Sequence, residues 1–508
     1  MDLRQQLAER DAQIAERDAR IAALEAENAD LKARIVELEA LVAKLNKIVF
    51  GKSSEKRSEK MARPYKEIEE QDRIKPDPEV IKKKRKAREE FRKQNATQVQ
   101  INHVLEEAKR RCPHCEDQVL KPAGTKESVV FEFVPAHFER EVHVQESWAC
   151  PCCDHIVTAD GPKRPTEGAL YGPGFVSHVV VSKCADSIPF YRMAKQFNRI
   201  GIPMSRSTLC DLFHQAATIL EPLYQFMQCL VMSSMLVLAD ETPLQVLDKN
   251  LDKTRRGYIW VFLSDLVAYY RFSPNRSGET PSEVLGSSEG TLMADGYTGY
   301  NKVTDPGGRE RAGCMAHARR KFFEALQTAP KEAQYMLDQI LNLYRVEYEA
   351  VKQDIVGTLT HTQLRRARAG PILEQMKTWV EQQQPHHLPR SPMGQAITYM
   401  LNQWSPLTHY LTDGKIPIDN NLSERRLRLI ALGRKNYLFA GHDAAAQNLA
   451  VLQSLVVTCD MHGVNSEVYL KDVLIRVQTH PNKDIGDLLP HRWKELFAPQ
   501  IPNSTFEL

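Results

Sequence analysis

The sequence has few cysteines, no long apolar run and almost no net charge, and each of these absences excludes a class of protein. Ten cysteines among 508 residues are too few for a disulfide scaffold. No apolar run approaches the roughly eighteen residues of a membrane span, and the N-terminus is charged from Asp2 onward, so we expect neither a membrane span nor a signal peptide. Lys and Arg number 68 against 65 Asp and Glu, a net charge of +3 that indicates no particular partner. We therefore expect a cytoplasmic globular protein of about three domains.

The first fifty residues show a seven-residue repeat. One set of positions is mostly β-branched and a leucine set follows three residues later: Leu7, Ile14, Ile21, Asn28, Ile35 and Val42, then Leu24, Leu31, Leu38 and Leu45. This pattern favours a parallel two-stranded coil, in which a single Asn fixes the register. We predict a coiled coil over 1–50 that makes a homodimer or higher oligomer, with fraying at its start, where Arg10 and Arg17 replace leucine. A single amphipathic helix packed on its own chain is the alternative.

Basic residues gather after these heptads. Residues 51–111 hold nineteen Lys and Arg against twelve Asp and Glu. The densest run lies in a predicted linker or arm over 51–100 and consists of Lys82, Lys83, Lys84, Arg85 and Lys86. An arm on DNA phosphates is one interpretation and a solvated linker is the other. A basic-zipper factor is excluded, because its basic region precedes the heptads.

Half of the cysteines lie between residues 112 and 153. Two Cys-x-x-Cys pairs supply the chemistry of a tetrahedral thiolate site for structural Zn²⁺: Cys112, Cys115, Cys150 and Cys153. We predict a zinc-binding module over 101–165, with strands between the pairs. Cys152 could replace Cys150 or Cys153, and His114 and His155 are spare donors. Unliganded reduced cysteines are the alternative.

Residues 166–230 predict helices. Within them, 189–213 predict a helix, a turn at Gly201 and a second helix, which is helix-turn-helix order. Ser205 would cap the second helix, leaving Arg206 and Ser207 near its start, where groove-reading side chains lie. An ordinary helical hairpin has the same pattern, so DNA recognition and plain packing both remain open.

Two aspartates follow apolar runs in the second half of the chain. We expect strands at about 235–247, 257–264 and 266–273, a short helix near 280–288, a strand up to Asp295 and another near 309–315. Asp240 ends the apolar run 235–239, and Asp295 ends 290–294. With a helical glutamate, two strand-end aspartates can share hard divalent cations and support two-metal phosphodiester chemistry. Acidic residues after strands also serve as helix caps and turn formers.

The glutamate of this set is Glu424, in a helix-like segment over 419–428. Asp419 is the expected N-cap, and Asn420, Asn421 and Arg428 would share a face with Glu424. Arg425 and Arg426 point elsewhere and could meet phosphate. A solvated, charged helix end is the alternative.

The remaining segments predict helices and one ambiguous motif. Residues 330–410 are rich in helix formers and predict a helical insertion, and 431–508 predict a C-terminal helical region that starts with a turn at 433–437. Cys314 and His317 have Cys-x-x-His spacing, but no second pair lies nearby in the sequence. A structural role is favoured. His317 is a further candidate for contacting a scissile phosphate, and Arg319, Arg320 and Lys321 for contacting the DNA backbone.

Four segments resemble the insertion sequence 66 family of transposases: 238–243 around Asp240, 295–300 from Asp295, 314–322 around His317 and 419–425 around Glu424. The resemblance spans nearly the whole chain. It implies a coiled-coil-like segment, a zinc-finger-like region, a ribonuclease H-like catalytic core and a small C-terminal region, in this order. With the helix-turn-helix region over 166–230, the expected fold is multidomain α+β, with the ribonuclease H-like α/β core over 231–430 and the insertion at about 330–410.

The resemblance also implies an activity, that of a DDE transposase. Asp240, Asp295 and Glu424 would be its catalytic triad and would hold Mg²⁺ or Mn²⁺. The implied partners are transposon terminal repeats and target DNA, which places the protein at the nucleoid, and accessory proteins of the same element stay open. Two other functions stay open too: a ribonuclease H-like nuclease or resolvase without joining activity, and a DNA-binding regulator derived from a transposase.

Overall fold

A computed structural model describes residues 138, 140–149, 156–159, 161–248, 253–304 and 307–498, together with Lys82 and Lys86. The chain divides into two compact units, Met1–Glu67 and Ile68–Leu508, and every described residue belongs to the second. The predicted coiled coil, Lys83, Lys84 and Arg85, and both cysteine pairs therefore lie outside the described residues. No helix in the described part of the chain is long and apolar enough to cross a membrane.

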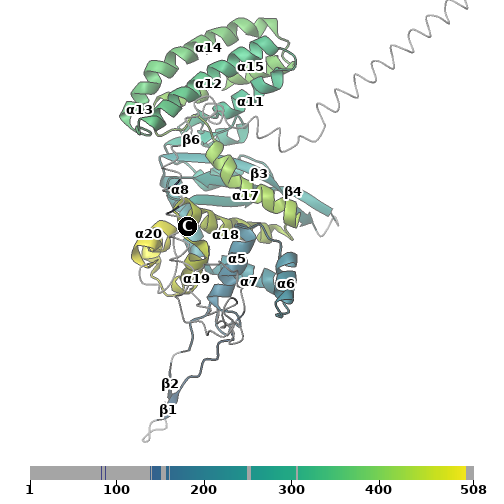
Figure 1. The fold of residues 1–508 in the computed structure, drawn as a ribbon, viewed down its shortest axis with the longest axis vertical. Coiled ribbons are helices and arrows are strands. Elements are labelled where there is room, and N and C mark those ends of the chain that lie inside the picture. The colour runs from purple at the N-terminus through teal and green to yellow at the C-terminus, as the bar shows by residue number, and fades with distance from the viewer. Residues whose placement is uncertain are drawn as a thin grey trace, which may run out of the picture. The chain divides into compact units, whose positions relative to one another are not determined.

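The main sheet has five strands in the order β5-β4-β3-β6-β7 (Figure 1). They are β3 (Leu236–Asp248), β4 (Lys253–Leu263), β5 (Ala268–Ser273), β6 (Thr291–Ala294) and β7 (Glu310–Gly313). The first three form an antiparallel meander, and β6 and β7 run parallel to β3. All five expected strands are confirmed. The inner strand β4 is rich in aromatic and β-branched residues that are buried on both faces, as in Ile259–Leu263, a composition that favours a strand.

Two helices from the C-terminal part of the chain pack on this sheet (Figure 1). α17 (Asn421–Tyr437) packs against β3, and α18 (Asp443–Met461) packs against the edge strand β5. The backbone N–H of Tyr270 donates to Ser454 Oγ at 2.8 Å, and that of Ala268 donates to Thr458 Oγ1 at 3.1 Å. Buried polar side chains of α18 thus satisfy amide groups that the last strand of a sheet would otherwise leave unpaired.

Helices precede the sheet, as expected. They are α5 (Pro173–Cys184), α6 (Phe190–Arg199), α7 (Arg206–Ile219) and α8 (Glu221–Ser233). The turn between α6 and α7 contains Gly201 with φ +83°, a conformation that favours glycine. Ser205 is the N-cap of α7, as predicted, and its Oγ accepts the N–H of Thr208 at 3.0 Å. A short hairpin, β1 (Ser147–Ala149) with β2 (Ile156–Thr158), flanks the second cysteine pair.

The expected helices over 330–410 are confirmed. They are α12 (Pro330–Lys352), α13 (Leu359–Leu364), the π-helical turn η3 (Arg365–Ala369), α14 (Gly370–Gln383), α15 (Pro392–Asn402) and α16 (Trp404–Thr408). Between β7 and this group lies α11 (Met315–Ala325), which packs against α12 and α15 (Figure 1). Two short helices, α9 (Glu279–Leu285) and α10 (Asn301–Thr304), flank β6, and α19 (Ser466–Arg476) and α20 (Pro490–Leu496) end the described chain.

Two predictions around α17 are wrong. The N-cap is Asn420 and not Asp419. Asp419 lies one residue before the cap, where its Oδ1 accepts the N–H of Asn421 at 3.0 Å and its Oδ2 accepts the Tyr344 hydroxyl at 2.7 Å. Residues 433–437 are not a turn but the last helical turn of α17. Their helix continues because Arg434 donates to Thr242 Oγ1 at 2.9 Å and so holds this end of α17 on β3.

Candidate active site

The two aspartates are neighbours across parallel strands. Leu238 of β3 pairs with Met293 of β6, and Asp240 and Asp295 each follow two residues later. Asp240 lies within β3 and Asp295 directly follows the end of β6, so the two carboxylates lie on neighbouring strands at the same end of β6. The Asp295 carboxylate accepts the N–H of Tyr297 at 2.9 Å, which orients it at the end of β6. The strand pairing thus joins two residues that lie 55 positions apart in the sequence.

The third carboxylate reaches this part of the sheet from the start of α17. Asn420, which is fully buried, donates from Nδ2 to the carbonyl oxygen of Ala239 at 2.8 Å. This contact ties the N-cap of α17 to the residue before Asp240. Glu424 lies in the first turn of the helix, with its N–H bonded to the Asn420 carbonyl at 3.3 Å. The first turn is where a helix dipole favours an anionic side chain.

Strand pairing and the Asn420 bond bring Asp295 and Glu424 toward Asp240, and their charges act on its pKa. Burial raises the pKa of Asp240 well above its usual value, and the negative charges of Glu241, Glu424 and Asp295 raise it further. The N–H of Glu241, 2.9 Å from Asp240 Oδ1, lowers it. Repulsion of this kind is relieved by a bound cation, and carboxylate oxygens are the donors that hard divalent cations take.

The three acids do not by themselves form a closed metal cage. Among the residues that the structure describes, no group of three or more His, Cys, Asp and Glu side chains is arranged so that it could hold a metal ion. The donor chemistry fits a hard divalent cation, provided that several of its ligands come from outside the chain. Phosphate oxygens and water are such ligands for Mg²⁺, which keeps few protein ligands.

One neighbour of the site was missed by the sequence analysis. The side chain of Glu241 is 3% exposed, and its Oε1 forms an ion pair with Arg276. Its other oxygen accepts the hydroxyl of Tyr300 at 2.8 Å. Burial raises the pKa of Glu241, while Tyr300 and Arg276 lower it. Only its position beside Asp240 hinted at a role, because its two partners lie 35 and 59 residues away in the sequence.

The Cys-x-x-His segment lies at the site with its two residues in different roles. Cys314 is buried as the N-cap of α11, and its sulfur accepts the N–H of Asn420 at 3.2 Å. Burial raises the pKa of this thiol, so it stays protonated and structural. His317 Nε2 lies 3.8 Å from Glu424 Oε1, and an Arg320 nitrogen lies 3.9 Å from the same oxygen. Both side chains thus approach the carboxylate site.

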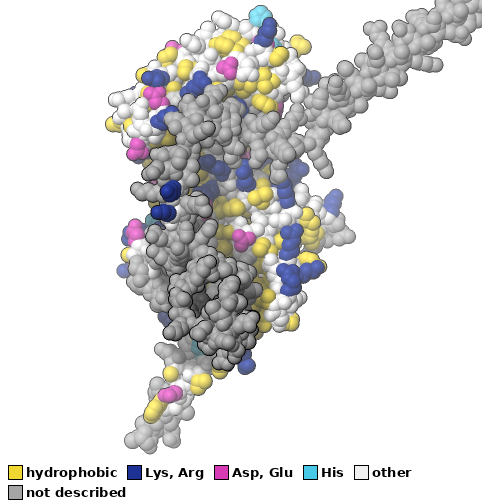
Figure 2. All heavy atoms as spheres, in the orientation of Figure 1, with side chains coloured by type: hydrophobic (Ala, Val, Ile, Leu, Met, Phe, Trp, Pro, Cys, Tyr) yellow, Lys and Arg dark blue, Asp and Glu magenta, His cyan; other side chains and the backbone are white. Residues whose placement is uncertain are grey.

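The predicted DNA contacts fall into exposed and buried positions. Arg206, Ser207, Arg425 and Arg428 are exposed, as are Lys82 and Lys86. Arg319 is 5% exposed, which leaves little of it for a phosphate, so its position argues against the predicted contact. Figure 2 shows Lys and Arg side chains gathered over α17 and α6. These helices are neighbours, since Arg192 of α6 donates to Asn436 of α17 at 3.5 Å.

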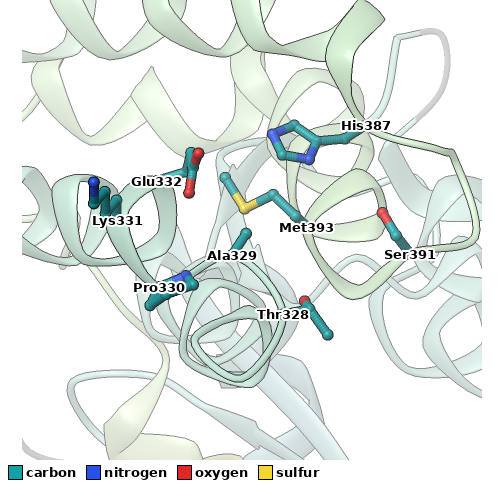
Figure 3. A pocket seen from close by; sticks show the side chains of 8 residues that line it. All are labelled: Thr328, Ala329, Pro330, Lys331, Glu332, His387, Ser391 and Met393. Atoms are coloured by element: carbon teal, nitrogen blue, oxygen red, sulfur yellow. The ribbon is translucent and has the colours of Figure 1, made fainter.

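A separate hollow of about 380 Å³ lies near the start of α12 (Figure 3). It is lined by Thr328, Ala329, Pro330, Lys331, Glu332, His387, Ser391 and Met393. None of the three carboxylates lines it, and its titratable residues are Lys331, Glu332 and His387. The carboxylate cluster is therefore the candidate active site.

Comparison with protein families gives three matches along the chain. The family described as "Transposase IS66 family" matches residues 168–448, and "IS66 C-terminal element" matches 454–491. The "zinc-finger binding domain of transposase IS66" matches 109–154, a range that contains both cysteine pairs. The first match covers more than half of the chain and all three carboxylates, and the last supports a structural Zn²⁺.

The chain is also similar to curated bacterial proteins. "Uncharacterized protein y4jD" of Sinorhizobium fredii (strain NBRC 101917 / NGR234) is 30% identical over 410 residues, which cover 77% of this chain and 80% of the relative. "Uncharacterized protein y4hP" of the same strain is 28% identical over 427 residues, which cover 79% and 77%. Their names state no activity.

Proposed function

Because the chain belongs to the transposase IS66 family, we propose that it is the DNA transposase of an insertion sequence, which binds the transposon ends and catalyses metal-dependent strand cleavage and strand transfer. The proposal rests on the pairing of β3 with β6, which puts Asp240 and Asp295 on neighbouring strands, and on the Asn420 bond that holds the start of α17, with Glu424, against β3. We assign the sheet and its helices to a ribonuclease H-like core. The antiparallel meander followed by two parallel strands supports that assignment.

The three carboxylates have the chemistry of a two-metal site for phosphoryl transfer. Bound Mg²⁺ or Mn²⁺ would supply Lewis-acid stabilisation of the attacking and leaving oxygens. Asp240, Asp295 and Glu424 would hold the cations from the protein side, and the open arrangement leaves ligand positions to the DNA phosphate and to water. His317 and Arg320, both near Glu424, would contact the phosphate that enters there.

DNA binding is assigned to parts of the chain outside the carboxylate site. We infer that Zn²⁺ held by Cys112, Cys115, Cys150 and Cys153 folds an end-binding module, and that Lys82–Lys86 contact phosphates as a basic arm. Arg206 and Ser207, exposed at the start of α7, would contact the DNA groove. Arg425 and Arg428 of α17 would contact the backbone beside the active site.

The decisive experiment replaces each carboxylate by its amide. Asp240→Asn, Asp295→Asn and Glu424→Gln keep the shape but lose metal affinity, so cleavage and joining in Mg²⁺ should fall by several orders of magnitude for each. Binding to the element's ends should persist, because phosphate and groove contacts come from other residues. In vitro cleavage and strand-transfer assays with the transposon ends measure cleavage and joining.

Asp419→Asn is the matched control, since Asp419 is a buried acid five residues before Glu424 that is bonded to Tyr344. It should keep more activity than any triad variant. Loss of catalysis in Asp419→Asn with near-normal strand transfer in Glu424→Gln would show that the third ligand is misassigned.

Two further functions share parts of this site. A ribonuclease H-like nuclease or resolvase would cut but not join, so an assay that detects joined products separates it from a transposase. A DNA-binding regulator derived from a transposase would need no acidic cluster. The family match over 168–448, which includes all three carboxylates, favours the enzyme over the regulator.

A further inference from the structure

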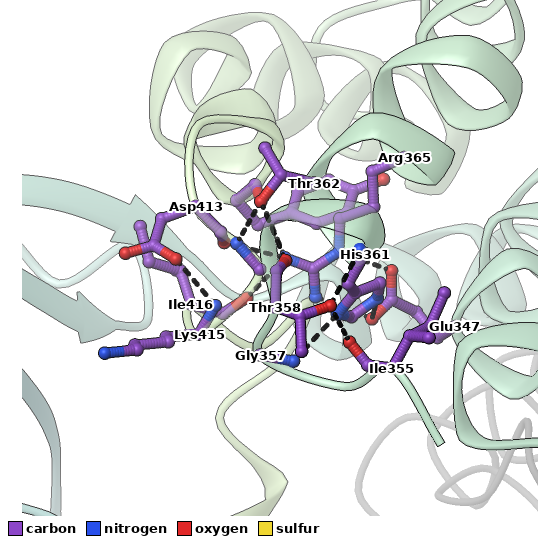
Figure 4. A network of polar contacts seen from close by, with 12 residues as sticks. Glu347, Ile355, Gly357, Thr358, His361, Thr362, Arg365, Asp413, Lys415 and Ile416 are labelled. Carbon is purple, nitrogen blue, oxygen red and sulfur yellow. Dashed lines mark hydrogen bonds and ion pairs between the residues drawn. The ribbon is translucent and has the colours of Figure 1, made fainter. Parts of the chain in front are cut away.

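A buried arginine links the helices that precede α17. Arg365 is 1% exposed and begins η3, the π-helical turn between α13 and α14. Its guanidinium donates two hydrogen bonds to Glu347 of α12, from Nε to Oε1 at 2.8 Å and from NH2 to Oε2 at 2.6 Å (Figure 4). Glu347 is 5% exposed. A bidentate pair that is shielded from water has a fixed geometry, so this pair is a rigid anchor.

The same guanidinium holds the loop that leads to α17. Its NH1 lies within hydrogen-bonding distance of three backbone carbonyls, those of Tyr410 at 2.8 Å, Asp413 at 2.9 Å and Ile416 at 2.9 Å, so one of its two N–H groups is shared between two of them. The loop therefore bends around the arginine side chain. Because a guanidinium offers donors in a fixed plane, these bonds determine the path of residues 410–416.

Gly414 brings this loop against α13. Its N–H donates to Thr362 Oγ1 at 2.8 Å. A Cβ at position 414 would lie 2.7 Å from the carbonyl oxygen of Thr358, so the approach leaves no room for a side chain. The loop is thus held from two sides before it reaches α17.

The residues after the loop connect it to the active site. The carbonyl of Ile418 accepts the N–H of Met315, which begins α11, at 3.1 Å. The carboxylate of Asp419 accepts the hydroxyl of Tyr344 on α12 at 2.7 Å. Asn420 then donates to the carbonyl of Ala239, beside Asp240. Every residue from Ile418 to Asn420 is buried, and Glu424 follows one turn later.

We propose that Arg365 and Tyr344 are positioning residues that set the placement of Glu424 relative to Asp240. This inference rests on the proposed function, since it assigns Glu424 to the active site. On this proposal, the helical segment between β7 and α17 has a structural role at the active site. It anchors the third carboxylate, which comes from a different part of the chain than the two sheet aspartates and shares no strand pairing with them.

The need for such an anchor follows from geometry and charge. Glu424 is held near Asp240 although the two carboxylates repel each other, so α17 needs contacts that resist its displacement until cations bind. A displacement of about 1 Å in a catalytic group can lower a rate by on the order of a hundredfold. Contacts at 410–420 are the nearest rigid elements before the helix, and they depend on Arg365 and Tyr344.

Two conservative variants of the full-length protein test the proposal. Tyr344→Phe removes the hydroxyl that binds Asp419 and keeps the ring. Arg365→Lys keeps the buried charge but loses the fork of donors. The matched control is Arg368→Lys, because Arg368 pairs with Glu349 at 2.7 Å between the same two elements, η3 and α12, at an exposed position.

Three measurements distinguish positioning from general stability. Hydrogen exchange of peptides covering 410–428 should quicken in Tyr344→Phe and Arg365→Lys, with the sheet peptides unchanged. Titration with Mn²⁺ alone should show weaker binding than in the unmodified protein. In cleavage assays kcat should fall by about tenfold or more with little change in KM for the end DNA. Arg368→Lys should behave as the unmodified protein does.

The outcomes separate this proposal from the function on which it rests. If Glu424→Gln is inactive while Tyr344→Phe and Arg365→Lys retain normal exchange, Mn²⁺ binding and kcat, the positioning role is wrong and the proposed function stands. If Glu424→Gln itself cleaves and joins normally, the assignment of Glu424 to the active site fails, and with it the premise of the positioning role, while the strand-transfer activity stands. Should Arg365→Lys unfold, Tyr344→Phe decides the question, because it loses a single hydroxyl.

Discussion

At the scale of single residues, the site combines groups that are unfavourable for folding. Asp240 carries a raised pKa because it is buried and has Glu241, Glu424 and Asp295 around it. The folded state therefore binds a proton on Asp240 more tightly than the unfolded state does. At a pH above the raised pKa the ionised carboxylate lowers stability, and this cost is lost as the pH falls through that pKa.

This charge cluster predicts an unusual effect of a substitution. Without divalent metal, Asp240→Asn should melt at a higher temperature than the unmodified protein at neutral pH, because it removes a buried negative charge next to three others. The difference in melting temperature between the two proteins should shrink as the pH falls. Differential scanning calorimetry at several pH values measures it.

Added Mg²⁺ provides the second half of that measurement. It should raise the melting temperature of the unmodified protein more than that of Asp240→Asn, because ligand binding stabilises the folded state. Glu324→Gln, an exposed acid on α11, is the control and should show neither effect. A melting temperature of Asp240→Asn below that of the control at every pH would contradict the proposed charge repulsion.

At the scale of elements, stability and recognition can be separated on α7. Ser205 caps the helix through the N–H of Thr208, and Ser205→Ala should lower the free energy of unfolding by about 0.5–2 kcal/mol. Arg206 is exposed next to Ser205, and replacing Arg206 by alanine should leave the free energy of unfolding nearly unchanged.

For Arg206→Ala we expect weaker binding to the transposon ends and a smaller salt dependence of that binding. Fluorescence anisotropy at two or more salt concentrations checks both effects. Lys331→Ala, at an exposed position on α12, is the control for loss of one positive charge. Equal affinities of the two variants would assign α7 to packing alone.

The cysteine pairs make another prediction at this scale. The purified protein should contain about one Zn²⁺ per chain, since the hairpin of β1 and β2 flanks the second pair and the zinc-finger match covers both. Elemental analysis of the purified protein measures this zinc content. Zinc content that survives the double substitution Cys115→Ser with Cys153→Ser would rule out these ligands.

At the scale of the whole molecule, the heptads predict self-association. Deleting residues 20–48 should shift the protein to a lower oligomeric state in light scattering, because the Ile, Val and Leu seam is removed. Asn28→Val should strengthen the association and loosen its register. An unchanged oligomeric state after the deletion would place the main interface elsewhere in the chain.

The sequence alone determined the features that depend on neighbours along the chain. Periodicity located five strands and the helices around them, because the spacing of buried side chains is a local property. A serine before α7 predicted its cap for the same reason. The three carboxylates were recognisable from the residues beside them, although their convergence was not.

Only the tertiary structure decided how distant segments meet. The pairing of β3 with β6 brings Asp240 beside Asp295, and the bonds of Asn420 bring α17 to the same part of the sheet. Asp419 is bonded to Tyr344, 75 residues away in the sequence, and lies one residue before the N-cap Asn420. Arg365 gave no sequence signal, since its partners are mostly backbone carbonyls, which every residue carries. Long-range hydrogen bonds and shared burial exist only after the chain has folded, and local patterns do not contain them.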